Sequence, residues 1–325
     1  MKVSKTEFIQ QLNDWGKQKI PFLFVVDFEM EKPLAWKLSA VDPLAIKYNI
    51  RGFTNTVDAG LQESPGNLTI FPTPFESYER KFKFVFGQLN FGYSFLINLT
   101  DKTRIQIDSS LSVLFQQSKA PYKLLFNDEF LVFSPESFIQ IRNNKLFSFP
   151  MKGTIDSNIP NAKEKILTDP KELAEHITIV DLIRNDMSHV TSNVKVKRFR
   201  YIEEIKTHEK NLLQVSSEIV GDLKSDYVSQ IGSLIMSFLP AGSVSGAPKS
   251  KTLEIIRTAE KEKRGYYTGV FGYFDGVDLD SGVMIRYIER SGDKLYYRSG
   301  GGITTQSNAR SEYQELIDKV YVPID

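Results

Sequence analysis

A lysine and a glutamate in this sequence could act together as a nucleophile and a general acid. Lys152 stands in the segment FPMKGT (149–154), directly after a predicted strand, and Glu136 stands in SPESF (134–138), a similarly abrupt setting. Both groups would need burial that moves their pKa values toward neutrality. The other interpretation of Lys-Gly-Thr is a solvated turn, and these residues alone leave both interpretations open.

Two pairs of glutamates could bind a metal ion. Glu172 and Glu175 lie three residues apart on one predicted helix, and Glu312 and Glu315 repeat that spacing on another. Residues three apart share one helix face, so the two helices could bring four carboxylates around a hard divalent cation. Oxygen ligands and retained waters favour magnesium. The alternative is that glutamates near the start of a helix complement its dipole.

Three further features could bind an anionic ligand. Lys249 follows a loop of small residues, 239–248, whose glycines have the wrong spacing for a phosphate-binding loop. Arg286 lies in an otherwise apolar predicted strand, where a charge is costly unless it is paired. The run 300–302 is three glycines, which allow a ligand to approach the backbone closely. The residues alone therefore indicate a possible magnesium-dependent enzyme for an anionic small molecule.

The composition excludes several classes of protein. The chain has 325 residues, a net charge of +1, no cysteine and three histidines. These counts exclude disulfides and thiolate chemistry, and they argue against nucleic-acid binding and against a zinc site. The first twenty residues are unlike a signal peptide, and no apolar run approaches the roughly 20 residues that span a bilayer. We therefore expect a cytoplasmic protein without a membrane partner.

The hydrophobic pattern predicts helices and strands without a linker, and hence a single α+β domain over 1–325. Helices are predicted at 5–18, 78–89, 109–116, from Asp169 onward, at 227–237, from 249 to near 265, and at 309–320. Strands are predicted at 21–28, 93–98, 130–133, 139–141, 146–149, 213–220, 269–274, 283–289 and 294–298. Asp169, Pro170 and Glu172 have the spacing of a capping box.

The chain resembles the chorismate-binding enzymes, most closely the aminodeoxychorismate synthases (component I). The segments that carry the resemblance are 134–138, 150–154, 175–186, 242–249, 264–269, 285–286, 299–303 and 312–320. The match is strong over 130–321 and weak over 1–129. It implies an α+β sandwich of two large antiparallel sheets flanked by helices.

The resemblance also implies roles for individual residues. Glu175 and Glu315 would bind magnesium directly, with Glu172 and Glu312 in support. The metal would hold one carboxylate of chorismate. The residues that would hold the other carboxylate are Tyr267, Arg286, Gly301 and Gly302, and those that would shape the pocket are Ser245, Gly246 and Lys249. Lys152 would attack the chorismate ring while Glu136 protonates the departing hydroxyl, although a competing mechanism gives Lys152 only an electrostatic role.

Lys152 distinguishes among the relatives, because anthranilate synthases of the family usually carry alanine there. Gln214 aligns with a histidine that assists pyruvate loss in those enzymes, and Leu96 lies near a lysine that activates water in isochorismate synthases. Ile155-Asp156 departs from the basic residues common in the family. The prediction is amination of chorismate to 4-amino-4-deoxychorismate, with ammonia from a glutamine amidotransferase subunit. The alternatives are anthranilate synthase component I and a chorismate-binding subunit without turnover.

Overall fold

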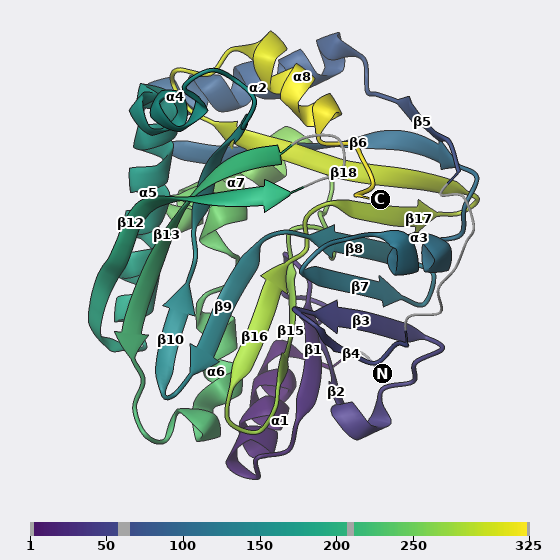
Figure 1. Ribbon diagram of the computed structural model, residues 1–325, viewed down its shortest axis with the longest axis vertical. Helices are drawn as coiled ribbons and strands as arrows, with labels where there is room; N and C mark the ends of the chain where they lie inside the picture. Colours follow the sequence, from purple (N-terminus) through teal and green to yellow (C-terminus); the bar gives the residue numbers. More distant parts are fainter. Residues whose placement is uncertain (1–2, 58–65, 207–210, 324–325) are drawn as a thin grey trace.

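The computed structural model describes residues 3–57, 66–206 and 211–323, and within them it forms two nine-stranded sheets (Figure 1). The helices are α1 (Lys5–Lys17), α2 (Phe75–Asn90), α3 (Leu111–Gln117), α4 (Ala162–Thr168), α5 (Pro170–Ser188), α6 (Ile231–Ser237), α7 (Lys249–Glu260) and α8 (Ala309–Asp318), with short 3-10 turns η1 (Leu38–Ala40), η2 (Tyr227–Gln230) and η3 (Gly242–Val244). The strands are β1 (Phe22–Val26), β2 (Leu34–Lys37), β3 (Ile46–Ile50), β4 (Phe53–Thr54), β5 (Leu68–Phe71), β6 (Leu96–Ile107), β7 (Tyr122–Phe126), β8 (Phe130–Ser134), β9 (Ser137–Arg142), β10 (Lys145–Ser148), β11 (Met151–Asp156), β12 (Ser192–Lys206), β13 (Asn211–Asp222), β14 (Gly246–Ala247), β15 (Val270–Phe274), β16 (Leu279–Val283), β17 (Tyr287–Ser291) and β18 (Lys294–Ile303).

Both sheets are antiparallel throughout the described residues. The first has the order β11-β13-β10-β9-β16-β15-β1-β2, with β12 paired to β13. The second has the order β14-β6-β18-β17-β8-β7-β3-β4, with β5 paired to β6. The expected α+β fold of two large antiparallel sheets is confirmed.

Strand β1 shows how the layers are built, because all five of its residues are buried. Phe22, Phe24 and Val26 belong to the core that the first sheet shares with α1, α5 and α6. Leu23 and Val25 belong to a second core that also takes residues from β3, β7 and β8 of the other sheet. Alternate side chains of a strand point to opposite faces, so β1 is apolar on both faces and lies between a helical layer and the second sheet.

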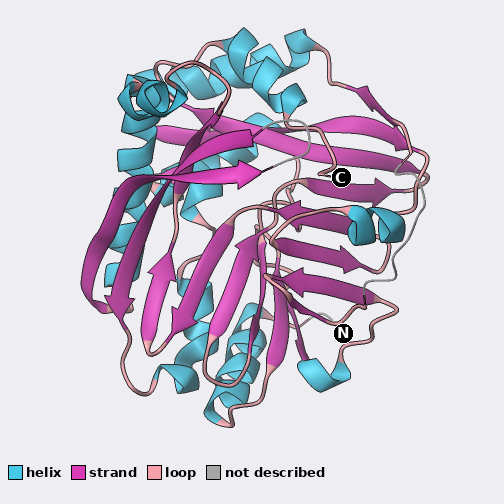
Figure 2. Cartoon of the chain, in the orientation of Figure 1, coloured by secondary structure: helices cyan, strands magenta, loops and turns pink. Residues whose placement is uncertain are grey.

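Helices α2, α7 and α8 cover the end of the second sheet that contains β6 and β18. Their apolar residues pack in one core with Ile97, Leu99 and Ile303 of those strands. Figure 2 shows most helices at the margin of the molecule and the strands between them. Among the described residues, no helix has both the length and the apolar character that crossing a bilayer requires.

Most predicted elements are confirmed, with shifted ends. The hairpin across Asn143 and Asn144 forms as β9 and β10, and both asparagines have the positive φ that such a turn requires. Asp169 caps α5 by accepting a bond of 2.9 Å from the Glu172 amide. The Glu172 carboxylate does not complete a capping box and points toward Gly153 instead. This frees the carboxylate for the site described below.

The prediction of one strand over 283–289 is wrong. Strand β16 ends at Val283, Arg286 takes a φ of 52°, and β17 begins at Tyr287. The Phe133 amide donates to the Arg286 carbonyl at 3.2 Å, which draws the chain from the first sheet into the second. Strand β6 also runs to Ile107, far beyond the predicted 93–98, because its polar residues hid the continuing pattern.

Candidate functional site

The centre of the candidate site is the glycine run at the end of β18. Gly301 and Gly302 pair with Leu99 and Asn98 of β6, and their backbone is that of an ordinary strand without positive φ. A Cβ added to Gly302 would lie 2.9 Å from Leu96 Cδ1, 3.2 Å from Glu175 Oε2 and 3.4 Å from Lys152 Nζ. The missing side chain therefore leaves bare backbone next to a carboxylate and an amine.

Lys152 reaches this centre from the other sheet. The pairing of β11 with β13 shifts register between Met151 and Thr154, and Gly153 takes a φ of +86° there. Such a bulge redirects the adjacent side chain. The Lys152 ammonium lies 3.7 Å from Glu175 Oε2, and its side chain is only 17% exposed. Lys152 is thus partly buried beside Glu175, and its role as a nucleophile stays a prediction.

The two acidic pairs converge here, from α5 and α8. A Cβ on Gly153 would lie 3.1 Å from Glu172 Oε2, and one on Gly301 would lie 3.5 Å from both Glu312 Oε2 and Glu315 Oε1. Glu175, Glu312 and Glu315 therefore lie beside one short stretch of backbone, and Glu172 lies beside Gly153, next to Lys152 in sequence, which supports the interpretation that the two pairs share one site. Glu175 and Glu312 are buried. Glutamates that served only to complement the helix dipole would not need to be buried.

Two lysines that the sequence interpretation missed neutralise these carboxylates. Lys171 Nζ lies 2.9 Å from Glu312 and 3.9 Å from Glu175, so it bridges α5 and α8. Lys319 Nζ lies 2.6 Å from Glu315 and donates to the Gly300 carbonyl at 2.8 Å. Each lysine has a glutamate four residues away in sequence. The same spacing is common in ion pairs on exposed helix surfaces, so only the fold shows that these two lysines belong to the site.

The electrostatics of the cluster fit a bound cation. Burial raises the pKa of Glu172 and of Glu175, and a like-charged glutamate nearby adds to each rise. Burial opposes ionisation of Glu315 too, but Lys319 outweighs it and lowers that pKa. The Lys171 ammonium already lies between α5 and α8. A metal ion held by the carboxylate oxygens of the two acidic pairs would lie between the same helices. Within residues 3–57, 66–206 and 211–323 no three carboxylates or histidines form a ready metal cluster, so the metal site stays a prediction.

Glu136 occupies a partly buried position next to this cluster. Its carboxylate accepts a hydrogen bond from the Ser243 hydroxyl, and its amide donates to Ser134 Oγ at 3.1 Å. Burial raises the pKa of the Glu136 carboxyl, although Ser243 and the charges of Lys152 and Arg286 oppose the rise. A carboxyl whose pKa is raised in this way is suited to general-acid chemistry.

Arg286 and Tyr267 form a second wall. Among the described residues, no hydrogen-bond partner exists for the buried Nε of Arg286, whose guanidinium lies over the Tyr321 ring at 5.2 Å. A buried unpaired donor is unusual in a folded protein, and it leaves this N–H available to a ligand. Tyr267 is 3% exposed, and burial raises its pKa to about 12, so it remains a neutral donor.

The loop after η3 supports the site mainly through its backbone. The Ser245 hydroxyl donates to the Ala241 carbonyl at 2.9 Å, and the Asn98 amide donates to the Ser245 carbonyl at 2.9 Å. Gly246 pairs with β6 at a φ of +133°, where a Cβ would lie 1.9 Å from the Leu96 carbonyl. This loop therefore fixes β6 beside the glycine run.

Lys249 is held outside the glycine run. Its ammonium lies 2.6 Å from Asp186 Oδ2 and donates to the Phe238 carbonyl at 3.1 Å. Its predicted part in shaping the substrate pocket stays a prediction. Asp186 was not among the predicted site residues, although it ends the segment 175–186 that carries the family resemblance.

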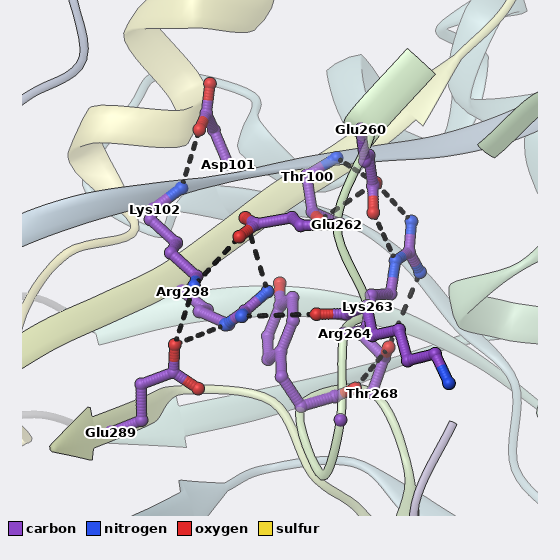
Figure 3. Close-up of polar contacts among 12 residues, drawn as sticks. Thr100, Asp101, Lys102, Glu260, Glu262, Lys263, Arg264, Thr268, Glu289 and Arg298 are labelled. Atoms are coloured by element: carbon purple, nitrogen blue, oxygen red, sulfur yellow. Dashed lines mark hydrogen bonds and ion pairs between the residues drawn. The ribbon is translucent and has the colours of Figure 1, made fainter. Parts of the chain in front are cut away.

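A buried arginine fixes the walls relative to one another. Arg264 is paired with Glu260 at 2.6 Å, and it donates to the Val244 carbonyl at 2.8 Å and to the Asn98 carbonyl at 2.7 Å. Glu260 also accepts from the Thr100 amide and hydroxyl. Figure 3 shows this network from α7 to β6, beside a second one around Arg298. The network ties the η3 loop, β6 and the Arg264–Thr268 turn together.

Comparison with known proteins identifies relatives over the whole chain. The sequence profile of the chorismate binding enzymes matches residues 6–325. A PabA-like protein of Haemophilus influenzae is 50% identical over 318 residues, which cover 98% of this chain and 97% of that protein. Aminodeoxychorismate synthase component 1 of Salmonella typhimurium is 30% identical over 258 residues, which cover 75% of this chain and 56% of that protein. The menaquinone-specific isochorismate synthase of Escherichia coli has the same fold, with a TM-score of 0.72 at 16% identity over 97% of this chain and 81% of that one.

Proposed function

The chain belongs to the chorismate-binding enzyme family, and we propose that it aminates chorismate to 4-amino-4-deoxychorismate with magnesium, for para-aminobenzoate and folate synthesis. The observation that carries this proposal is Lys152. Its amine lies 3.4 Å from the Cβ position of Gly302 and 3.7 Å from Glu175. A largely shielded amine at that point is placed for chemistry on the substrate ring.

Magnesium would be held by Glu175 and Glu315, with Glu172 and Glu312 supporting them. The donors are all carboxylate oxygens, as this hard cation prefers, and the Lys171 ammonium between the helices supports cation binding at that point. When bound, the metal would neutralise one substrate carboxylate. The unpaired Nε of Arg286 and the Tyr267 hydroxyl would hold the other.

The chain's own residues would then divide the reaction. Glu136 gives its proton to the allylic hydroxyl, which leaves as water, and its raised pKa keeps that proton available. Lys152 attacks the chorismate ring as the allylic hydroxyl departs, and ammonia afterwards adds at the carbon that the hydroxyl vacated and expels the lysine amine. The amine leaves as the neutral side chain, and the aminated product carries the nitrogen from ammonia. The chain has no cysteine to hydrolyse glutamine, so a glutamine amidotransferase partner would supply ammonia.

Two positions favour amination over the reactions of other family members. Leu96 Cδ1 lies 2.9 Å from the Cβ position of Gly302. Isochorismate synthases use a lysine near this position, whereas this chain has an apolar side chain there. Gln214 donates to Met151 Sδ at 2.9 Å and offers no imidazole to assist pyruvate loss. Anthranilate synthase component I is the second candidate, supported by the shared acidic pairs but not by Lys152.

The test is product identification by mass. The purified chain is incubated with chorismate, magnesium and ammonium, with and without a lyase that converts aminodeoxychorismate to para-aminobenzoate. We expect 4-amino-4-deoxychorismate alone and para-aminobenzoate with the lyase. Lys152→Ala should abolish most of the amination and keep magnesium-dependent chorismate binding, whereas the exposed Lys163→Ala should match the wild type. Release of anthranilate, or no amination even with a functional glutaminase, would refute the proposal.

A further inference from the structure

A small cavity of about 20 Å³ lies beside Glu136. Its lining is mainly apolar, and its polar side chains are those of Glu136, Ser137, Ser148, Asp186 and Ser243. A space of this size holds about one water molecule, provided that two or more polar groups face it. The cavity therefore joins Glu136 to a second carboxyl group.

Asp186 connects this cavity to the surface. Its Oδ2 lies 3.9 Å from the Cβ position of Gly242, next to the Ser243 that binds Glu136, and 2.6 Å from Lys249 Nζ. The side chains of Asp186 and Lys249 are 14% and 20% exposed, so the pair reaches solvent. Glu136 itself is only partly exposed, and the Asp186–Lys249 pair gives it a second connection to solvent through the cavity.

We propose that one water in this cavity and the Asp186–Lys249 pair form a proton relay that restores the proton of Glu136 after each turnover. The inference rests on the proposed role of Glu136 as the acid. In the forward step the substrate C–O bond breaks, the oxygen takes the Glu136 proton and leaves as water, and Glu136 becomes a carboxylate. In the return step the Asp186 carboxylate takes a proton from solvent and passes it to the cavity water, which gives one of its protons to Glu136, so that Asp186 ends again as a carboxylate.

The charges around both carboxyls suit this direction of transfer. Glu136 faces the cations Lys152, Arg286 and Lys319, and burial still raises its pKa. Asp186 faces Lys249 and His189, and burial raises its pKa as well. Two carboxyls that both bind protons more strongly than usual can exchange one through a shared water. Lys249 orients Asp186 and is a positioning residue.

The test follows the Glu136 proton directly and does not depend on the reaction. Infrared spectroscopy of the folded chain transferred into D₂O gives the exchange rate of the protonated Glu136 carboxyl, identified by subtracting the spectrum of Glu136→Gln. We expect Asp186→Asn to slow this exchange by about a hundredfold. The matched control is Asp181→Asn on the same helix, whose exposed carboxylate pairs with Arg184 and should leave exchange unchanged.

A second variant keeps both carboxyls and blocks the water. Ser148→Val fills the cavity from β10, where a branched side chain is favoured, and it should slow exchange as strongly as Asp186→Asn. Exchange at the wild-type rate in either variant would overturn the relay, and Ser148→Val decides alone if Asp186→Asn does not fold. If the exchange pattern holds but the wild type forms no aminated product, the relay stands and the proposed reaction falls.

Discussion

Replacing Glu260 by glutamine should destabilise the protein strongly, although the two side chains have nearly the same shape. Oε1 of Glu260 accepts from the Thr100 amide, the Thr100 hydroxyl and Arg264, and Oε2 accepts from Arg264 Nε at 2.9 Å. The amide of glutamine can replace only one oxygen. Its NH₂ group would therefore face the N–H of Arg264, and the guanidinium would lose its counter-charge.

The size of the effect follows from burial. The side chains of Glu260 and Arg264 are 3% and 1% exposed, so water cannot replace the lost interactions. Breaking a buried ion pair by removing one partner costs about 3–5 kcal/mol. The matched control is Glu254→Gln on the same helix, because Glu254 pairs with Lys251 at 2.8 Å in solvent. An exposed pair of this kind contributes about 0–1 kcal/mol.

Urea unfolding followed by circular dichroism measures the free energy of unfolding of both variants. We expect Glu260→Gln to lose several kcal/mol and Glu254→Gln to stay near the wild type. Because Arg264 also holds the Asn98 and Val244 carbonyls, Glu260→Gln should in addition weaken chorismate binding. Equal stabilities for the two variants would refute the view that this network fixes the walls of the site.

Two further predictions concern the site itself. Gly302→Ala should weaken chorismate binding by roughly tenfold or more, because losing one close ligand contact costs about 1.4 kcal/mol or more. The control is Gly87→Ala, whose added methyl group meets open space. It should leave chorismate binding unchanged in the same titration. Glu136→Gln should be more stable than the wild type at high pH, with the difference shrinking as pH falls. Burial raises the pKa of the Glu136 carboxyl. The stability that the wild type gains from protonating this carboxyl is therefore complete below the ordinary pKa of glutamate and is lost as the pH rises through the raised pKa. Thermal unfolding of both proteins at several pH values tests this, and a stability difference that does not change with pH would contradict it.

The sequence predicted the parts of the fold that depend on local pattern. The helix that begins after Asp169 and the hairpin across Asn143 follow from capping and turn chemistry that act within a few residues. The break at Arg286 could not be predicted, because it arises where the chain passes between two sheets, and the sequence around it is uniformly apolar. Residues remote in sequence decide such a position.

The same division applies to the site. Lys152, Glu136 and the acidic pairs could be identified because they stand in motifs of a known family. Lys171 could not be identified, because its contact with Glu312 depends on the fold. Asp186 stands in one of the family segments, 175–186, but its pairing with Lys249, more than fifty residues away, could not be predicted. In sequence, Lys171 looks like an ordinary charged residue on an exposed helix face.

The missed lysines change what the site requires of its ligands. The cluster consists of Glu172, Glu175, Glu312, Glu315, Lys152, Lys171 and Lys319. In ionised form these groups sum to −4 + 3 = −1. A magnesium ion alone would bring the sum to +1, and a substrate with two carboxylates would return it to −1. The proposed metal and chorismate should therefore bind cooperatively.

Calorimetry without ammonia tests this coupling, since no turnover then occurs. We expect chorismate to raise magnesium affinity by about 5–150-fold, and magnesium to raise chorismate affinity by the same factor. Lys171→Met removes the ammonium between Glu175 and Glu312, which brings the sum to −2. Magnesium should then bind more tightly without chorismate, and the coupling should fall. Independent binding in the wild type, or coupling unchanged in Lys171→Met, would show that the lysines do not balance the charge of the site.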